Sequence, residues 1–168
     1  MYYLNLLLDS IIFFIPAYIA NALPVLASGF NLFSRIGVPI HKTIFGKSKT
    51  YRGFLFGVTG ALIVGLLQYY FGLYDELVYS LLLAFLLGFG ALLGDLFKSF
   101  VKRRIGIKSG QPWIVFDQID YVIGGLCFSY IVKPVPLETI IILLLISPLL
   151  SLGSNIISYA LKLKKVWW

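Results

Sequence analysis

The segment from residue 94 to residue 120 contains the side chains best suited to chemistry. Asp95 stands within a long apolar run, where an ionisable residue costs about 2.5–3.5 kcal/mol on membrane-insertion scales and is expected to have a partner or a function. Asp117 and Asp120 lie three residues apart at the start of the next apolar run, so both carboxylates share one face of a helix. Two neighbouring carboxylates repel each other unless a cation neutralises them. The three aspartates therefore predict a site for a hard divalent cation.

Five basic residues lie between these carboxylates: Lys98, Lys102, Arg103, Arg104 and Lys108. Four of them, Lys102, Arg103, Arg104 and Lys108, are suited to clamp the phosphates of a nucleotide or of a lipid headgroup. Mg²⁺ suits such a site because it keeps several waters and accepts phosphate oxygens. Zinc would need a Cys/His cluster, which this sequence lacks. The segment therefore predicts that Mg²⁺ and a polyphosphate bind together.

Simpler explanations exist for each set of charges. The dipole at a helix N-terminus would stabilise Asp117 and Asp120 without a metal. Basic loops are attracted to anionic lipids by about 1 kcal/mol per cation. The combination favours a metal and a polyphosphate, because a loop that only attracts lipids does not need buried acids.

The composition requires a membrane protein around this segment. Hydrophobic residues make up 60% of the 168 residues and charged residues only 12%, which excludes a soluble domain of this size. Apolar runs of about 20 residues are long enough to cross a bilayer, and they are continuous rather than alternating, which favours helices over a β-barrel. We predict an all-α integral membrane protein with a single domain, residues 1–168, and five transmembrane helices at about 6–28, 53–73, 77–97, 116–133 and 136–159.

The distribution of basic residues predicts the orientation of these helices. Thirteen of the fourteen Lys and Arg residues fall within 35–52, 98–108 and 162–165, and only Lys133 lies elsewhere. Because cytoplasmic loops carry the excess of Lys and Arg, loops 29–52 and 98–115 are predicted to be cytoplasmic. The N-terminus is then outside, the C-terminus is cytoplasmic, and the candidate site faces the cytoplasm from the plasma membrane. No nucleic-acid partner is expected.

Small residues recur every four positions in two of the predicted spans. They are Gly53, Gly57, Ala61 and Gly65 in one span, and Gly90 and Gly94 in the next. Small residues at this spacing let two helices approach closely. The pattern predicts helix packing, either within the chain or in a homodimer.

The ordered motifs resemble a known superfamily. The residues Gly94-Asp95-Leu96, Ser99, Lys102-Arg103, Lys108, Pro112 and Asp117-Gln118-Ile119-Asp120 are similar to the C-terminal signature of the phosphatidate cytidylyltransferases. Lys49-Thr50-Tyr51-Arg52-Gly53 resembles the K-T-x-E/R-G element of the same superfamily. The short chain, the five spans and the K-T-x-R-G form look most like the archaeal branch, the CDP-archaeol synthases.

The resemblance implies an Mg²⁺-dependent nucleotidyl transfer. The phosphate of a membrane lipid would attack the α-phosphorus of CTP, release pyrophosphate and form a CDP-lipid. The archaeal branch implies 2,3-di-O-geranylgeranylglyceryl phosphate as the lipid and CDP-archaeol with unsaturated chains as the product. The implied catalytic residues are Asp95, Asp117, Asp120 and Lys102, with the three aspartates as Mg²⁺ ligands. The implied CTP-binding residues are Lys49, Thr50, Arg52, Ser99, Lys102, Arg103 and Lys108.

The sequence also departs from the bacterial pattern. Ser109 stands where that pattern has Asp, and Gln118 replaces its Arg. The spacing from Pro112 to Asp117 is shorter, and the Gly-His-Gly-Gly stretch is absent. A role for that histidine therefore cannot be carried over, and the departures are those of a distinct branch.

Three other classes of protein are less consistent with these residues. A CDP-alcohol phosphotransferase expects Gly after the second Asp, but Tyr121 follows Asp120. A transporter would have charges near the centre of several spans, whereas these carboxylates gather at one interface. A non-enzymatic protein that binds anionic lipids would need only the basic loops. The cytidylyltransferase reaction accounts for carboxylates and cations together.

Overall fold

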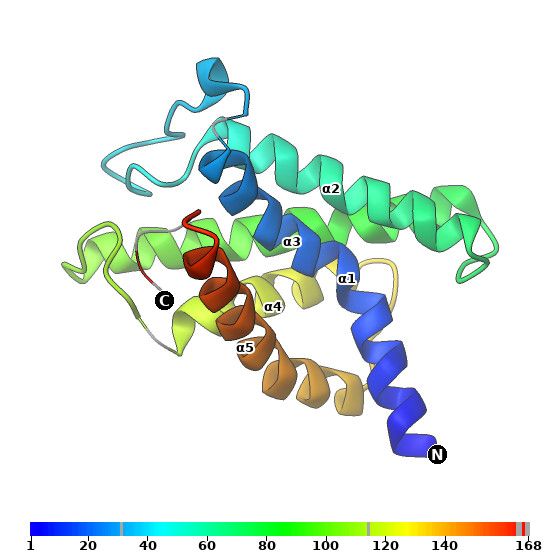
Figure 1. Ribbon diagram of the computed structural model, residues 1–168. Coiled ribbons are helices and arrows are strands. Elements are labelled where there is room, and N and C mark those ends of the chain that lie inside the picture. Colours follow the sequence, from blue (N-terminus) through cyan, green and yellow to red (C-terminus); the bar gives the residue numbers. More distant parts are fainter. Residues whose placement is uncertain (31, 114, 164–165, 167–168) are drawn as a thin grey trace.

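The computed structural model describes residues 1–30, 32–113, 115–163 and 166, and it is all-helical in this part of the chain. The α-helices are α1 (Tyr2–Gly29), α2 (Tyr51–Tyr70), α3 (Leu77–Arg104), α4 (Phe116–Ser129) and α5 (Leu137–Ala160), with a short 3₁₀ turn, η1 (Ser34–Ile36) (Figure 1). The β-structure within the described residues is one isolated bridge between Pro39 and Thr50. The prediction of an all-α protein is confirmed.

Four helices are long and apolar enough to cross a membrane: α1, α2, α3 and α5. Helix α4 has 14 residues, so it is about 21 Å long at 1.5 Å per residue, which is less than the hydrocarbon thickness. The transmembrane helix predicted at 116–133 is thus shorter than expected. It ends at Ser129, and residues 130–133 form a turn and a bend.

Helix α3 continues past the predicted end of its span at residue 97. Charged residues do not stop a helix, so Lys98 to Arg104 form its last two turns. The chain leaves the helix at Ile105, and Gly106 follows with a φ of +83°, a conformation that glycine adopts at little cost. Four of the five basic residues predicted to lie in a loop therefore lie on the helix, and only the fifth, Lys108, follows it.

Helices α3 and α4 touch backbone to backbone. A Cβ atom added at Gly90 would lie 2.4 Å from the carbonyl oxygen of Gly124, and one added at Gly94 would lie 2.3 Å from that of Asp120. Gly57 and Gly65 of α2 make similarly close contacts with α1 and α3, at the Ala20 carbonyl oxygen and the Ala84 Cβ. The predicted small-residue faces are thus used within the chain, and a homodimer stays a prediction.

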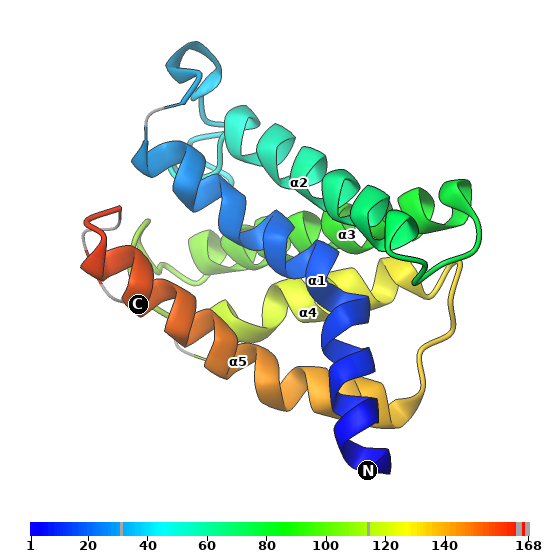
Figure 2. The ribbon, with the colours of Figure 1, turned by 45° about the vertical axis from the view of Figure 1, so that its right-hand side comes forward.

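Helix α1 packs against all four of the other α-helices. Helix α1 lies between α2 and α5 in both views of the ribbon (Figures 1 and 2). The apolar core joins α1, α3, α4 and α5 and includes the fully buried Phe14, Leu87, Val122 and Leu143. Helix α5 is the least buried of the four long helices. Helix α1 therefore lies at the centre of the bundle, and α5 is left largely exposed.

The contact between α3 and α4 gives a direct test of the packing. Replacement of Gly124 by Ala adds a Cβ 2.2 Å from the carbonyl oxygen of Gly90, so the helices must separate. We expect Gly124→Ala to destabilise the protein by about 1–3 kcal/mol, the usual cost of overpacking. The measurement is thermal unfolding of the detergent-purified protein by circular dichroism.

Gly153→Ala is the matched control, because a Cβ added at that position of α5 meets no atom within 4 Å among the described residues outside the adjoining turns of its own helix. Alanine is favoured over glycine in a helix interior by about 1 kcal/mol, so this variant should melt no lower than the wild type. Equal melting temperatures for Gly124→Ala and Gly153→Ala would contradict the close contact.

Candidate active site

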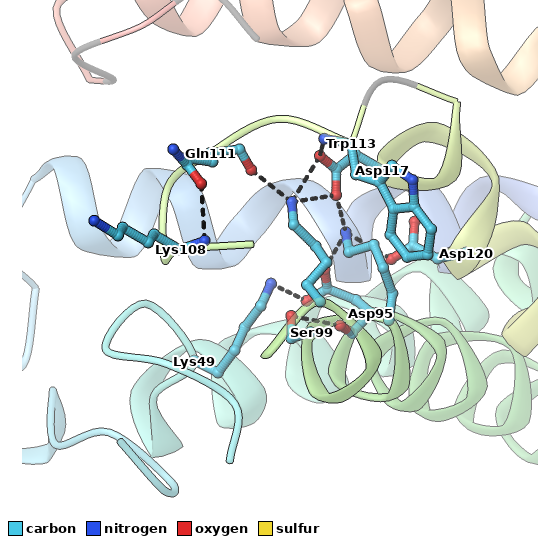
Figure 3. Close-up of polar contacts among 10 residues, drawn as sticks. Lys49, Asp95, Ser99, Lys108, Gln111, Trp113, Asp117 and Asp120 are labelled. Atoms are coloured by element: carbon cyan, nitrogen blue, oxygen red, sulfur yellow. Dashed lines mark hydrogen bonds and ion pairs between the residues drawn. The ribbon is translucent and has the colours of Figure 1, made fainter. Parts of the chain in front are cut away.

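The predicted carboxylates meet where the last turns of α3 pass the first turns of α4 (Figure 3). Asp95 comes from α3, and Asp117 and Asp120 come from α4. Lys49 reaches them from the segment that precedes α2, and its ammonium pairs with the Asp95 carboxylate. Residues 49, 95 and 117 are far apart in the sequence, so the packing of the helices assembles this site.

Lys98 lies at the centre of the three carboxylates. Its Nζ is 3.0 Å from an oxygen of Asp95, 3.1 Å from one of Asp117 and 2.9 Å from one of Asp120. The side chain is only 10% exposed. In the sequence Lys98 is one of five basic residues between the carboxylates, with no predicted role of its own. Its position three residues after Asp95, on the same helix face, is the signal that identifies it.

Lys102 completes the ionic network on the loop side. Its Nζ donates to both oxygens of Asp117 at 3.0 Å and to the Gln111 carbonyl oxygen at 2.7 Å. The Trp113 N–H donates to Asp117 at 2.6 Å, which ties that carboxylate to the chain entering α4. The loop between α3 and α4 is held by a further bond from the Lys108 N–H to the Gln111 side chain, at 2.9 Å. Backbone and side chains thus orient Asp117 together.

The network balances its charges. Three lysines, Lys49, Lys98 and Lys102, face the three aspartates through the five ion pairs among the described residues. Buried charges are stable only when they are paired. This balance therefore lets six ionised groups lie at the edge of the apolar core.

A cavity of about 650 Å³ adjoins the network and is lined by all five α-helices. The volume lies within the range of small-molecule sites, about 300–1,000 Å³. Its charged wall consists of Lys49, Asp95, Lys98, Lys102, Arg103 and Asp117. Ser151, Ser154 and Ser158 of α5 add hydroxyl groups, and Ile19, Val25 and Leu150 add apolar surface. The cavity can therefore hold a molecule with a charged part and a less polar part.

Several predicted residues lie at this cavity as expected. Thr50, Ser99 and Arg103 line it together with Lys49 and Lys102. Thr50 also accepts a hydrogen bond of 3.1 Å from the Gly53 N–H and so caps the start of α2, while the Ser99 hydroxyl donates to the Asp95 carbonyl oxygen at 2.8 Å. Thr50 thus stabilises the start of α2, directly after Lys49, and Ser99 is bonded to the backbone of Asp95 on α3.

Three predicted residues lie elsewhere. Asp120 is buried behind Lys98 and does not line the cavity. Arg52 is 6% exposed and donates to the Leu32 carbonyl oxygen at 2.9 Å, so it fastens the segment before α2 and is not at the cavity wall. The Lys108 side chain is exposed and points away from the carboxylates (Figure 3). Spacing along the sequence could not separate these residues from the ones at the cavity.

The carboxylates fit a hard cation by chemistry and by convergence. Among the described residues, no three His, Cys, Asp or Glu side chains form a ready-made metal site, because the three carboxylates are arranged around the Lys98 ammonium. Apart from the Lys98 ammonium, the carboxylate oxygens of Asp120 have no polar partner among the described residues. Oxygen ligands that already surround one cation are the donors that Mg²⁺ prefers.

Comparison with known proteins identifies the same family that the sequence motifs resemble. The family model described as CarS-like: CDP-archaeol synthase matches residues 3–168. A CDP-archaeol synthase of Methanocaldococcus jannaschii is 38% identical over 185 residues, with all of both chains covered. That of Pyrococcus furiosus is 37% identical over 171 residues, covering 96% of this chain and 98% of its own. That of Thermococcus gammatolerans is 42% identical over 166 residues, covering 93% of each.

A solved structure of an intramembrane enzyme for archaeal membrane lipids biosynthesis has the same fold. It superposes with a TM-score of 0.75 at 32% sequence identity and covers 89% of this chain and 94% of its own. The multi-pass membrane architecture and the resemblance found in the motifs are thereby confirmed. On the evidence of a match over nearly its whole length, the chain belongs to the CarS-like CDP-archaeol synthase family.

Proposed function

We propose that the protein transfers CMP from CTP to the phosphate of an isoprenoid-ether glycerolipid, which forms CDP-archaeol with unsaturated chains and pyrophosphate. The observation that carries this proposal is the charge-balanced network of three aspartates and three lysines at one wall of a cavity that all five helices line. The relatives named CDP-archaeol synthase support the same reaction. We take 2,3-di-O-geranylgeranylglyceryl phosphate as the lipid substrate.

The reaction needs positioning and charge neutralisation more than a strong base. An oxygen of the lipid phosphate, which is already anionic near pH 7, forms a bond to the α-phosphorus of CTP. The bond from that phosphorus to the pyrophosphate oxygen breaks, and pyrophosphate leaves with its electron pair. Lys49, Lys102 and Arg103 line the cavity and supply positive charge to the phosphates. Transfers of this type depend chiefly on alignment and electrostatic stabilisation.

We infer that Asp95, Asp117 and Asp120 hold Mg²⁺ during turnover. When bound, the ion would neutralise the triphosphate and the charge that develops on the leaving group. Asp117 has the most fixed carboxylate, because the Trp113 N–H and Lys102 both donate to it. The chain that enters α4 and helix α3 thus both orient this carboxylate.

The orientation in the membrane follows from the basic segments. We propose that loops 29–52 and 98–115 face the cytoplasm, which supplies CTP, and that the N-terminus is outside. Helix α4 would complete a fifth crossing together with the residues that lead to Pro136, which places the C-terminus in the cytoplasm. In this arrangement the single domain lies in the plasma membrane, nucleotide enters from the cytoplasmic side and the lipid enters from the bilayer.

The direct test of the reaction is incorporation of labelled CTP into organic-extractable lipid. Purified protein with Mg²⁺ should label 2,3-di-O-geranylgeranylglyceryl phosphate and release an equal amount of pyrophosphate. Diacyl phosphatidic acid is the comparison lipid, and EDTA should abolish the signal. A folded protein that labels neither lipid would instead favour a lipid-binding protein or a transporter.

The role of the carboxylates is tested by Asp117→Asn and Asp120→Asn. Each change removes one negative charge while keeping the side-chain size, so we expect turnover to fall by about 100-fold or more, equivalent to about 2.7 kcal/mol. The measurement is the initial rate at limiting Mg²⁺, with circular dichroism to check folding. Asp75→Asn, at an exposed position in the loop before α3, is the matched control and should keep full activity. Normal rates in either site variant would exclude the assigned ligands.

The topology is tested by cysteine accessibility. In a Cys127→Ser background, Ser48→Cys and Asp75→Cys place single thiols at exposed loop positions at opposite ends of α2. A membrane-impermeant maleimide should label Asp75→Cys in intact cells and Ser48→Cys only in inverted vesicles. The reverse pattern would mean that the site faces outward.

A further inference from the structure

Lys98 has a place in the site that differs from those of its neighbours. Lys49 pairs with Asp95, and Lys102 pairs with Asp117. Lys98 instead contacts all three carboxylates, at 2.9–3.1 Å, from a side chain that is only 10% exposed. One ammonium group therefore holds the whole set of predicted metal ligands together.

Asp120 depends on this contact more than the other aspartates. Its side chain is 7% exposed, and no backbone N–H or neutral side chain within the described part of the chain donates to its oxygens. The ion pair with Lys98, at 2.9 Å, is the one partner that the described residues give this carboxylate. Because an unpaired buried charge is strongly unfavourable, some cation must always be close to Asp120 while it is ionised.

The Lys98 ammonium and a divalent ion bound by the same oxygens exclude each other. Carboxylate oxygens lie about 2.0–2.1 Å from a bound Mg²⁺, and a metal held by these three side chains would occupy the space that the ammonium now fills. Two cations at one point would also repel each other.

We propose that Lys98 is the exchangeable internal counter-ion of this site: it holds Asp95, Asp117 and Asp120 together before substrate binds and leaves when a divalent cation arrives with the nucleotide. The inference rests on the proposed function, in which these aspartates bind Mg²⁺. Lys98 already lines the cavity, and its flexible four-carbon chain lets the ammonium turn from the carboxylates to a phosphate.

The exchange has a consequence for the order of events. A metal ion alone must displace Lys98 and leave its ammonium without a partner, so it should bind weakly. A metal that arrives with a triphosphate brings new oxygen partners for the displaced lysine. Metal and nucleotide therefore favour each other's binding, and because such coupling is reciprocal, the protein selects the metal–nucleotide complex over either component alone.

The test is binding of Mn²⁺ alone, measured by electron paramagnetic resonance of the free ion, with detergent-purified protein and neither nucleotide nor lipid. Lys98→Met removes the competing charge and keeps a side chain of similar length. We expect its dissociation constant for Mn²⁺ to be at least about tenfold lower than that of the wild type. Removal of one member of a close pair of charges typically changes the affinity by more than this factor. Its melting temperature should be lower without metal and should rise more on addition of Mn²⁺.

Two further variants separate the exchange from general effects of charge. Lys98→Arg keeps the positive charge among the carboxylates and should bind Mn²⁺ as weakly as the wild type. Lys108→Met removes a nearby lysine whose side chain is exposed and directed away from the carboxylates, so its Mn²⁺ affinity should not change. If Lys98→Met does not fold, Lys98→Gln provides the same comparison with a polar neutral side chain.

Equal or weaker Mn²⁺ binding after neutralisation of Lys98 would overturn the inference, and so would tenfold tighter binding by Lys108→Met. Because the assay contains no CTP or lipid, its result does not depend on turnover. Failure of the wild type to label lipid with CTP would count against the proposed function alone.

Discussion

The backbone contact between α3 and α4 determines where the site can form. Gly94 and the Asp120 carbonyl group are so close that no side chain fits between them. Asp95 follows Gly94 directly, so the same contact brings the Asp95 carboxylate next to the two aspartates of α4. A bulkier residue at this crossing would push the helices apart and draw the Asp95 carboxylate away from those of Asp117 and Asp120.

The short distance between α3 and α4 allows the charges to be paired inside the bundle. Breaking a buried pair by removing one partner typically costs about 3–5 kcal/mol, because the other charge is left uncompensated. Here every carboxylate that the site needs faces at least one lysine, and the bundle can keep six ionised groups at the edge of its apolar core. The site is thus assembled before substrate arrives, and binding requires changes of side-chain partners without a change in how the helices pack.

Much of this architecture could be predicted from the sequence. The apolar runs predicted each of the five helices, because continuous hydrophobicity over such lengths has few other solutions. The run at 116–133 gave no sign that α4 ends at Ser129, since hydropathy measures partition into lipid and not helix length. The motif residues Asp95, Asp117 and Lys102 do meet at the cavity. Arg52 lies in the same kind of motif but turns to the Leu32 carbonyl oxygen, and only tertiary structure decides between these orientations.

The chemistry of the two basic side chains explains where each is used. An arginine has five donors in a planar fork, and Arg52 uses one of them to hold the backbone carbonyl group of Leu32. A lysine is a compact charge on a flexible chain that can change partners with little reorganisation. The three cations paired with carboxylates among the described residues are all lysines: Lys49, Lys98 and Lys102. In the proposed reaction the phosphates of CTP take over such partners one by one, so the lysines that pair with the carboxylates would also supply the cations that the triphosphate requires.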